Sequence, residues 1–467
     1  MSRPRAERVL LTEHWVVDPV SRRAGVATIE VHSGKVARLE WRDGIAEARR
    51  TFIEGGEPGV KDPKRLVLPA LIDLHAHFRQ PGSGASEDVA SGEAAAAHGG
   101  YGAVALMPNS EPAADHPALL RELTRSAAPR GLTLMPIAAA TLGRAGGALS
   151  PMAELAAAGA VAFSDDGSPI ADPARFRSAL ITAGALGLPL IEHCEDPGLT
   201  KGGEAADGLV ATALGLQPWP AAGEISAVVR NIALLRDAAR DEPRVRLHLT
   251  HLSTAQALDA VRAARAEGLP ITCDITPHHF SITDAWIAGD QRWAWEYSEK
   301  RPAALTPTAD AYNTNLRVCP PLRNAGDAAA CRAALRDGTA SAIATDHAPH
   351  SRDKKEVEFG LAANGIAGIE TALSTALAAR AAGEFPLSLM AALFTTGPAA
   401  VLNRPALARG LAVGGPANLL VVDLAATWVP TRKTLVGRSI NTPLLGRPLP
   451  GVVLMTLLNG EVAWKAE

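Results

Sequence analysis

The sequence predicts a (β/α)8 barrel that carries a small β-sandwich built from both ends of the chain. Short apolar runs alternate with alanine-rich helical patterns in the middle of the chain. Polar residues and histidines end most of these runs, and both chain ends are rich in strand patterns. A doubly wound open sheet shows the same alternation. The polar endings favour the barrel, because barrel active sites form at the carboxyl ends of the strands.

Both ends of the chain read as short strands joined by turns. The predicted strands and turns are Val9–Leu11, Val26–Val31, Ser33-Gly34 (turn), Lys35–Leu39, Asn418–Asp423, Val452–Leu458, Asn459-Gly460 (turn) and Glu461–Trp464. We therefore expect one discontinuous β-sandwich domain, residues 1–68 and 401–467, around a catalytic barrel of residues 69–400.

The middle of the chain supplies eight strand-then-helix units. The predicted strands are Val67–His77, Ala103–Met107, Leu134–Ala140, Val161–Ser164, Leu190–His193, Leu247–His251, Ile271–Ile275 and Ala342–Thr345. The clearest helical patterns between them are Glu87–His98, Pro117–Ser126, Asp172–Leu186, Ala255–Glu267 and Ala328–Leu335.

Two stretches depart from this alternation. Asp196–Glu224 is rich in glycine and proline and is predicted to be a long loop. Thr276–Arg317 is longer than an ordinary connection and holds Trp286, Trp293 and Trp295. It could form a lid, a subunit contact or a local mini-core, and we favour the last two.

Composition excludes several classes of protein. The 467 residues are 47% hydrophobic and 20% charged, with a net charge of −3 and no basic block, so nothing indicates nucleic-acid binding. No apolar stretch is long enough to span a membrane. The apolar run Val9–Leu11, which follows the basic segment Arg3–Arg8, is too short for a signal peptide. The four cysteines show no CxxC spacing, which fits a reducing cytoplasm.

The first chemical signal is the pair His75 and His77 at the end of an apolar strand. Residues two apart on a strand share a face, so both imidazoles can reach one metal ion. A His-x-His pair often occurs by chance, but its position at the end of an apolar strand favours metal binding here.

Three further signals end strands in the same way. His193 and His251 close their strands, and Asp346 follows Ile343–Thr345. A lone histidine is more often structural than ligating. The whole set, all on the predicted catalytic face, favours a metal site.

The surrounding motifs resemble the amidohydrolase superfamily, and specifically the dihydroorotase family. The matching stretches are DLHAHFRQPG (73–82), AAAAHGGYGAVALMPNSEP (94–112), AFSDDG (162–167), EHCED (192–196), HLTHLST (248–254), TPHH (276–279), PPLR (320–323), ATDHAPHS (344–351), GIAGIET (365–371) and SINTP (439–443). The resemblance covers nearly the whole chain.

This resemblance implies a metal set. His75, His77 and Asp346 would hold one Zn²⁺, and His193 and His251 a second, so one or two zinc ions are expected per subunit. Asp346 would act as general base and then general acid.

Asp166 sets this chain apart from the wider superfamily. Hydantoinases, allantoinases and some dihydroorotases bridge their metals with a carboxylated lysine, but Val161–Gly167 contains none and Lys201 lies well beyond it. The resemblance to the SDDG class assigns the ligand to Asp166. Asp165 is its neighbour, which could merely cap the next turn.

The resemblance also assigns substrate contacts to His77, Arg79, Asn109 and His350. An arginine suits a carboxylate because its planar fork can bind both oxygens. His278 and His279 are expected to pack or support the ligands.

Two departures from the family pattern affect the predicted ring pocket. Cys319 stands where the family commonly has an asparagine that touches the pyrimidine ring, and Ala363-Asn364 replace Pro-Phe. We expect Cys319 and Asn364 to face the substrate.

The implied activity is the reversible hydrolysis of (S)-dihydroorotate to N-carbamoyl-L-aspartate in pyrimidine (UMP) biosynthesis. One alternative is a hydantoinase- or allantoinase-like cyclic amidohydrolase. Another is a non-catalytic dihydroorotase-like subunit that supports aspartate carbamoyltransferase. Aspartate carbamoyltransferase and a second copy of the chain are the candidate protein partners.

Overall fold

Eight parallel strands form the central sheet of the computed structural model, which describes residues 8–125 and 130–466. The strands follow one another in chain order around the sheet, and its two edges meet where Ala76 pairs with His347. There the main-chain N–H of His77 donates to the carbonyl of His347 at 2.8 Å. The predicted barrel is therefore confirmed. Its strands are β5 (Leu71–Ala76), β6 (Tyr101–Leu106), β7 (Thr133–Ala139), β8 (Ala162–Ser164), β9 (Leu190–His193), β12 (Leu247–Thr250), β13 (Ile271–Ile275) and β14 (Ala342–Ile343).

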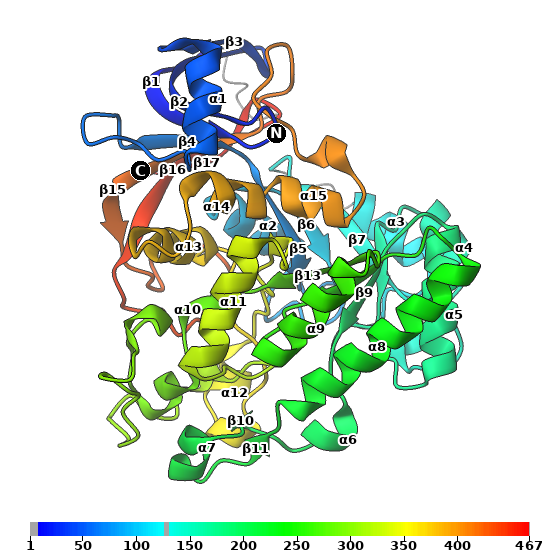
Figure 1. Cartoon of the computed structure of the whole chain (residues 1–467). Helices are drawn as coiled ribbons and strands as arrows, with labels where there is room; N and C mark the ends of the chain where they lie inside the picture. The colour runs from blue at the N-terminus through cyan, green and yellow to red at the C-terminus, as the bar shows by residue number, and fades with distance from the viewer. Residues whose placement is uncertain (1–7, 126–129, 467) are drawn as a thin grey trace.

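Helices cover the outside of this barrel (Figure 1). Several begin at a residue whose side chain accepts a main-chain N–H of the first turn, as Asp88, Asp172, Thr254 and Asn324 do. The helices of the barrel and of the loops after its strands include α2 (Val89–His98), α3 (Pro117–Arg125), α4 (Met152–Ala157), α5 (Pro173–Ala185), α8 (Ala222–Asp241), α9 (Ala255–Ala266), α10 (Pro277–Ser281), α11 (Ala325–Asp337), α12 (Arg352–Lys355), α13 (Ala372–Ala381), α14 (Leu387–Leu393) and α15 (Thr396–Val401). Ser126, the predicted end of α3, and the basic residues 3–7 lie outside the described residues.

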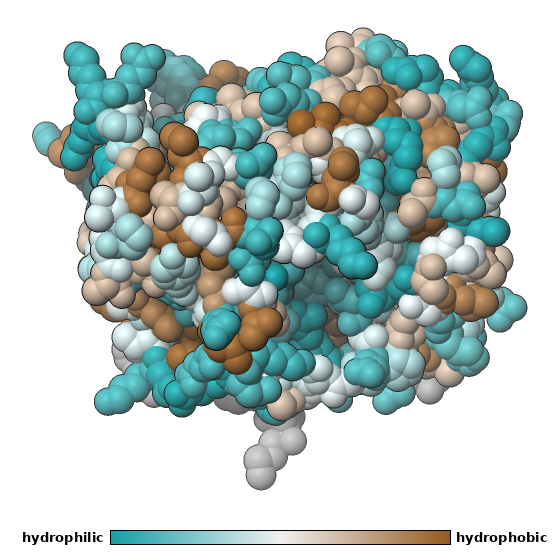
Figure 2. Space-filling model, turned by 90° about the horizontal axis from the view of Figure 1, so that it is seen from below, coloured by the Kyte–Doolittle hydropathy of each residue, from teal (hydrophilic) through white to brown (hydrophobic). Residues whose placement is uncertain are grey.

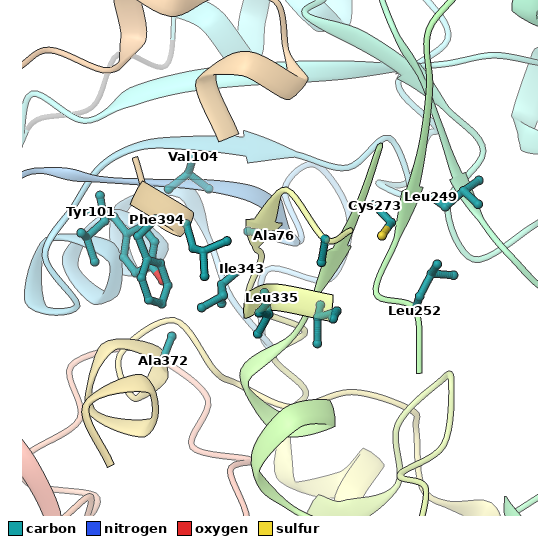
Figure 3. Packing of buried hydrophobic residues seen from close by; sticks show 14 of the residues in the cluster. Ala76, Tyr101, Val104, Leu249, Leu252, Cys273, Leu335, Ile343, Ala372 and Phe394 are labelled. Atoms are coloured by element: carbon teal, nitrogen blue, oxygen red, sulfur yellow. The ribbon is translucent and has the colours of Figure 1, made fainter. Parts of the chain in front are cut away.

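Two apolar clusters hold the barrel together. One lies between strands and helices, and Figure 3 shows part of it, with the rings of Tyr101 and Phe394 side by side at 6.3 Å between centroids. The other joins Ile72, Ile191 and Ala342 from strands that are not all neighbours, so it fills the barrel interior. The barrel is thus a packed core, and its side chains are free to form a site only at the strand ends.

The predicted strand Val67–His77 was wrong as a single element, because the chain changes sheets at Ala70. β4 (Arg65–Pro69) pairs with strands of the terminal sheet, whereas β5 begins the barrel. Both segments are buried, so the apolar run is continuous and its pattern does not reveal the change of pairing partner.

The chain ends form one seven-stranded sheet at the end of the barrel opposite the loops that follow its strands (Figure 1). The turn at Gly34 contacts the turn at Gly460, where an added Cβ on Gly460 would lie 1.9 Å from the Cα of Gly34. The sheet therefore folds over on itself and encloses an apolar cluster of its own. Its elements are β1 (Arg8–Asp18), β2 (Arg23–His32), β3 (Lys35–Trp41), β4, β15 (Leu419–Trp428), β16 (Leu449–Leu458) and β17 (Glu461–Lys465), with α1 (Gly44–Ile53) beside β2.

The two long insertions are more ordered than the sequence predicts. The predicted loop 196–224 contains α6 (Pro197–Thr200), β10 (Ala205–Ala206), α7 (Leu209–Leu214) and β11 (Pro218–Trp219). In the second insertion Trp286 is 1% exposed within an apolar cluster, and the Arg447 guanidinium lies 4.1 Å from the centre of the Trp293 ring. The mini-core interpretation of the tryptophan-rich segment is confirmed.

The loops after the barrel strands, including α6, α7 and α12, lie at the lower end in Figure 1. Figure 2 views this face directly and shows a hydrophilic hollow near its middle. Among the described residues, no helix is both long enough and apolar enough to cross a membrane.

Candidate active site

The six predicted metal ligands converge at the carboxyl ends of the barrel strands. Each is at most 5% exposed. They come from five strands or the loops directly after them: His75 (β5), His77 (after β5), Asp166 (after β8), His193 (β9), His251 (after β12) and Asp346 (after β14).

The first group of ligands consists of His75, His77 and Asp346. The two Nε2 atoms lie 3.1 Å apart, and Asp346 Oδ1 lies 3.3 Å from His75 Nε2 and 3.1 Å from His77 Nε2. Asp166 Oδ2 completes this group at 3.4 Å from His75 Nε2.

The second group of ligands consists of His193 and His251, whose Nδ1 and Nε2 atoms lie 3.0 Å apart. Asp166 Oδ1 lies 3.9 Å from His193 Nδ1 and 3.7 Å from His251 Nε2. One oxygen of Asp166 therefore faces each group, which is the arrangement of a carboxylate that bridges two cations. The stretch Val161–Gly167, which supplies Asp166, contains no lysine.

These donors fit metal ions better than they fit one another. Two imidazole nitrogens that face each other at about 3 Å can share only one proton, and this occurs in both groups. The buried Oδ1 of Asp166 accepts no hydrogen bond from the described residues. Nitrogen and carboxylate oxygen are the donors that Zn²⁺ takes in such sites.

Electrostatics lead to the same conclusion. Burial opposes charge on His75, yet the carboxylates of Asp166 and Asp346 raise its pKa to about 9. Burial likewise opposes ionisation of both aspartates, but the neighbouring histidines hold the pKa of each below its usual value. The site therefore favours ionised carboxylates and requires positive charge beside them.

Side chains behind the ligands set their orientation, as is usual at metal centres. His77 Nδ1 lies 2.7 Å from Asn109 Oδ1, and Asn109 Nδ2 donates to Asp166 Oδ2 at 3.3 Å. His75 Nδ1 lies 2.9 Å from the hydroxyl of Thr250. The second group has a comparable support, because His193 Nε2 lies 2.9 Å from Glu195 Oε2.

Backbone strain is concentrated at the same place. Arg79, His251 and Asp346 have φ values of 55°, 43° and 45°, a region that costs residues with a Cβ roughly 1–3 kcal/mol. At His251 the main-chain N–H donates to Asp274 Oδ1 at 2.7 Å, which helps to hold this position.

Arg79 lies beside the predicted metal ligands, and it forms no ion pair with a carboxylate of the described residues. Its Nε donates to the carbonyl of Pro349 at 3.2 Å, and no described carboxylate lies within ion-pair distance. His350 Nε2 donates to the carbonyl of Asn364 at 2.7 Å and lies 3.4 Å from Arg79 Nη2. The Nη atoms of Arg79 are thus left for an anion, and burial lowers the pKa of its guanidinium.

Cys319 lies beside the second ligand group, with its Sγ 3.5 Å from both His193 Nε2 and Glu195 Oε2. Asn364 places its side-chain oxygen 3.1 Å from Arg317 Nε and its main-chain carbonyl at His350. His278 is buried near the ligands, and burial lowers its pKa to about 4.

Sequence reasoning missed Glu195 and Arg144. Glu195 follows His193 by two residues, a spacing that could have indicated a shared face. Thr200 donates to its other oxygen, and His193 holds the pKa of Glu195 at about 2 despite partial burial. Arg144 Nη1 donates to the main-chain carbonyl of Asp166 at 2.6 Å, and no motif marked it.

The comparisons agree with this geometry. Residues 64–256 match the dihydro-orotase-like family and residues 230–463 the amidohydrolase family. Among solved structures, L-hydantoinase from Arthrobacter aurescens superposes with a TM-score of 0.78 at 20% identity, covering 98% of this chain and 96% of that one. Dihydropyrimidinase from Brevibacillus agri gives 0.73 at 18%, covering 98% and 95%. A barrel with this histidine and aspartate set defines a hydrolase of cyclic amides within the amidohydrolase family.

Sequence relatives narrow the class further. The dihydroorotase of Anaeromyxobacter dehalogenans strain 2CP-1 is 40% identical over 448 residues, which is 96% of this chain and 95% of the relative. The dihydroorotase of Pelotomaculum thermopropionicum is 37% identical over 459 residues, covering 97% and 98%, and that of Mycobacterium leprae 39% over 407 residues, covering 86% and 88%. The chain belongs to the dihydroorotase family.

Proposed function

We propose that this chain is a zinc-dependent dihydroorotase that opens and closes the ring of dihydroorotate in pyrimidine synthesis. The observation that carries the substrate assignment is Arg79. A guanidinium next to two converging ligand groups, with no carboxylate partner of its own among the described residues, suits a substrate that brings a carboxylate. Dihydroorotate has one, whereas hydantoin and allantoin have none.

The proposed metal ligands divide between two ions. His75, His77 and Asp346 would hold one zinc, His193 and His251 the other, and Asp166 would reach both. When bound, zinc polarises an amide carbonyl and lowers the pKa of water to about 7.

Asp346 is the proposed general base and acid. Its carboxylate is ionised and lies at the centre of the first group, 3.1 Å from His77 Nε2. It would take a proton from the attacking water and return it to the ring nitrogen as the amide bond breaks. The reverse path closes N-carbamoyl-aspartate into the ring.

The residues around Arg79 would orient the substrate. The carbonyl of Pro349 accepts from Arg79 Nε and keeps the guanidinium in place beside His350, and Asn109 connects His77 with Asp166. We assign Asn109, like His77, to the edge of the pocket, where its amide can also contact substrate. Cys319 and the main chain at Asn364 would face the ring.

The two sister activities give a direct test. Purified protein loaded with zinc is assayed in parallel on dihydroorotate, hydantoin and allantoin, and dihydroorotate should be the preferred substrate. Preference for an uncharged ring would refute the substrate assignment. If the metal-loaded protein acts on none of the three substrates, the result would favour a non-catalytic subunit. Such a subunit should form a complex with aspartate carbamoyltransferase that is detected by size-exclusion chromatography. The same measurement shows whether the chain forms a homodimer.

A further inference from the structure

The motif Ser439–Pro443 has no part in the proposed reaction, yet it reaches the loops around the candidate site. It lies in the segment between β15 and β16, and its Asn441 is only 5% exposed. Ser439 Oγ donates to the carbonyl of Ser86 at 2.5 Å, and the main-chain N–H of Ala367 donates to the carbonyl of Asn441 at 3.0 Å. The motif is therefore fixed against the barrel.

The side-chain amide of Asn441 makes three hydrogen bonds, all to main chain. Its Oδ1 accepts the N–H of His350 at 2.9 Å, and its Nδ2 donates to the carbonyls of Ala348 at 3.1 Å and Gly365 at 3.0 Å. The reversed amide would direct N–H groups at an N–H and its oxygen at two carbonyls, so only this orientation is satisfied. One side chain thus ties the loop after β14 to the segment at Gly365.

The main chain that Asn441 ties down carries the two acceptors next to the candidate anion site. Pro349, between two of the tied residues, presents the carbonyl that accepts from Arg79 Nε at 3.2 Å. Asn364, one residue before the third, presents the carbonyl that accepts from His350 Nε2 at 2.7 Å. The orientation of both side chains therefore depends on main-chain positions that Asn441 holds.

The tied segments have little room to shift independently. Gly365 has a φ of 144°, and a Cβ added to it would lie 2.6 Å from the Cβ of Ala348 and 3.0 Å from His350 Nε2. A change in the spacing of the two segments would therefore move His350 as well. Misplacement of a positioning group by about 1 Å can cost a reaction roughly a hundredfold.

We propose that Asn441 is a positioning residue for the substrate carboxylate, and that it acts by holding Pro349 and His350 against Arg79. This inference rests on the proposed function, because a carboxylate at Arg79 is its premise. The amide of Asn441 bonds to main chain rather than to a proposed zinc ligand. Its loss should therefore weaken substrate binding, which raises KM, while kcat and zinc content stay close to the native values.

The test compares the zinc-loaded native protein with Asn441→Ala and Asn418→Ala. Asn418 is a matched control, because its Oδ1 accepts the main-chain N–H of Asn459 at 2.8 Å beside the terminal sheet, at the other end of the barrel. KM for dihydroorotate should rise about tenfold to hundredfold in Asn441→Ala and less than about twofold in Asn418→Ala. Thermal melting confirms that each variant is folded before kinetics are compared.

A double-mutant cycle separates positioning from a general loss of stability. Once Arg79→Lys has disrupted the carboxylate contact, adding Asn441→Ala should raise KM much less than it does in the native protein, because both changes affect one anchor. Amide hydrogen exchange gives a readout that needs no substrate. Peptides covering residues 346–351 and 364–368 should exchange faster in Asn441→Ala than in the native protein or in Asn418→Ala.

The outcomes distinguish this inference from the proposed function. Native protein that does not use dihydroorotate would refute the proposed function, and the carboxylate role with it, even if the exchange data confirm the contacts of Asn441. If the native enzyme is active, the inference alone is overturned by an unchanged KM in folded Asn441→Ala, by native exchange rates in both peptides, or by effects of Asn441→Ala and Arg79→Lys that simply multiply.

Discussion

Replacing Arg79 with lysine tests the substrate assignment most sharply. The guanidinium has its Nε bound to the carbonyl of Pro349, which leaves the two Nη groups for a carboxylate. Lysine keeps the charge but offers a single point of contact and loses the hydrogen bond to Pro349. A charge-assisted hydrogen bond contributes roughly 1.5–3 kcal/mol, so Arg79→Lys should lower kcat/KM for dihydroorotate about tenfold to hundredfold.

The assay compares steady-state kinetics and bound zinc in the native protein, Arg79→Lys and Arg352→Lys. Arg352 is an exposed arginine of α12 paired with Glu356, so its variant is a matched control with unchanged kinetics. Zinc content should be the same in all three proteins. Residual activity on hydantoin should not fall in Arg79→Lys, because that ring has no carboxylate. An unchanged kcat/KM on dihydroorotate, or a loss that follows loss of zinc, would refute the role given to Arg79.

Three further predictions concern the ligands and one buried lysine. His77→Ala and Asp346→Asn should each abolish turnover; near-normal activity of His77→Ala with full zinc content would remove it from the metal set. Asp166→Ala should lower the zinc content, and native activity should not depend on bicarbonate, since no lysine needs carboxylation; a carboxylated lysine found at the metals would contradict this. Burial lowers the pKa of Lys355 to about 7, against about 10.4 in an unfolded chain. At a pH between these two pKa values, the unfolded chain carries a proton on Lys355 that the folded chain lacks. This residue therefore makes the free energy of unfolding rise with pH, by up to about 1.4 kcal/mol per pH unit. Lys355→Met should remove that contribution, measured by denaturant unfolding at both ends of the window, and an identical slope in the variant would contradict the assignment.

The sequence alone predicted the barrel, the strands at both chain ends and the six side chains that converge at the strand ends. Strand faces repeat every two residues, so the spacing of His75 and His77 is enough to put both side chains on one face of their strand. Polar residues at the ends of apolar runs likewise predicted the barrel face on which these side chains meet. These features are local in the chain, and burial imposes them on every strand separately.

Only the tertiary structure decided which residues meet across the chain. The change of sheet at Ala70 was hidden because both neighbouring strands are buried and equally apolar. The division of Asp166 between two ligand groups, and the meeting of Glu195 with Cys319 across 124 positions, depend on how the barrel closes. Periodicity reports how deeply a face is buried, but it carries no information on which distant side chain lies opposite, because that depends on the packing of the whole barrel.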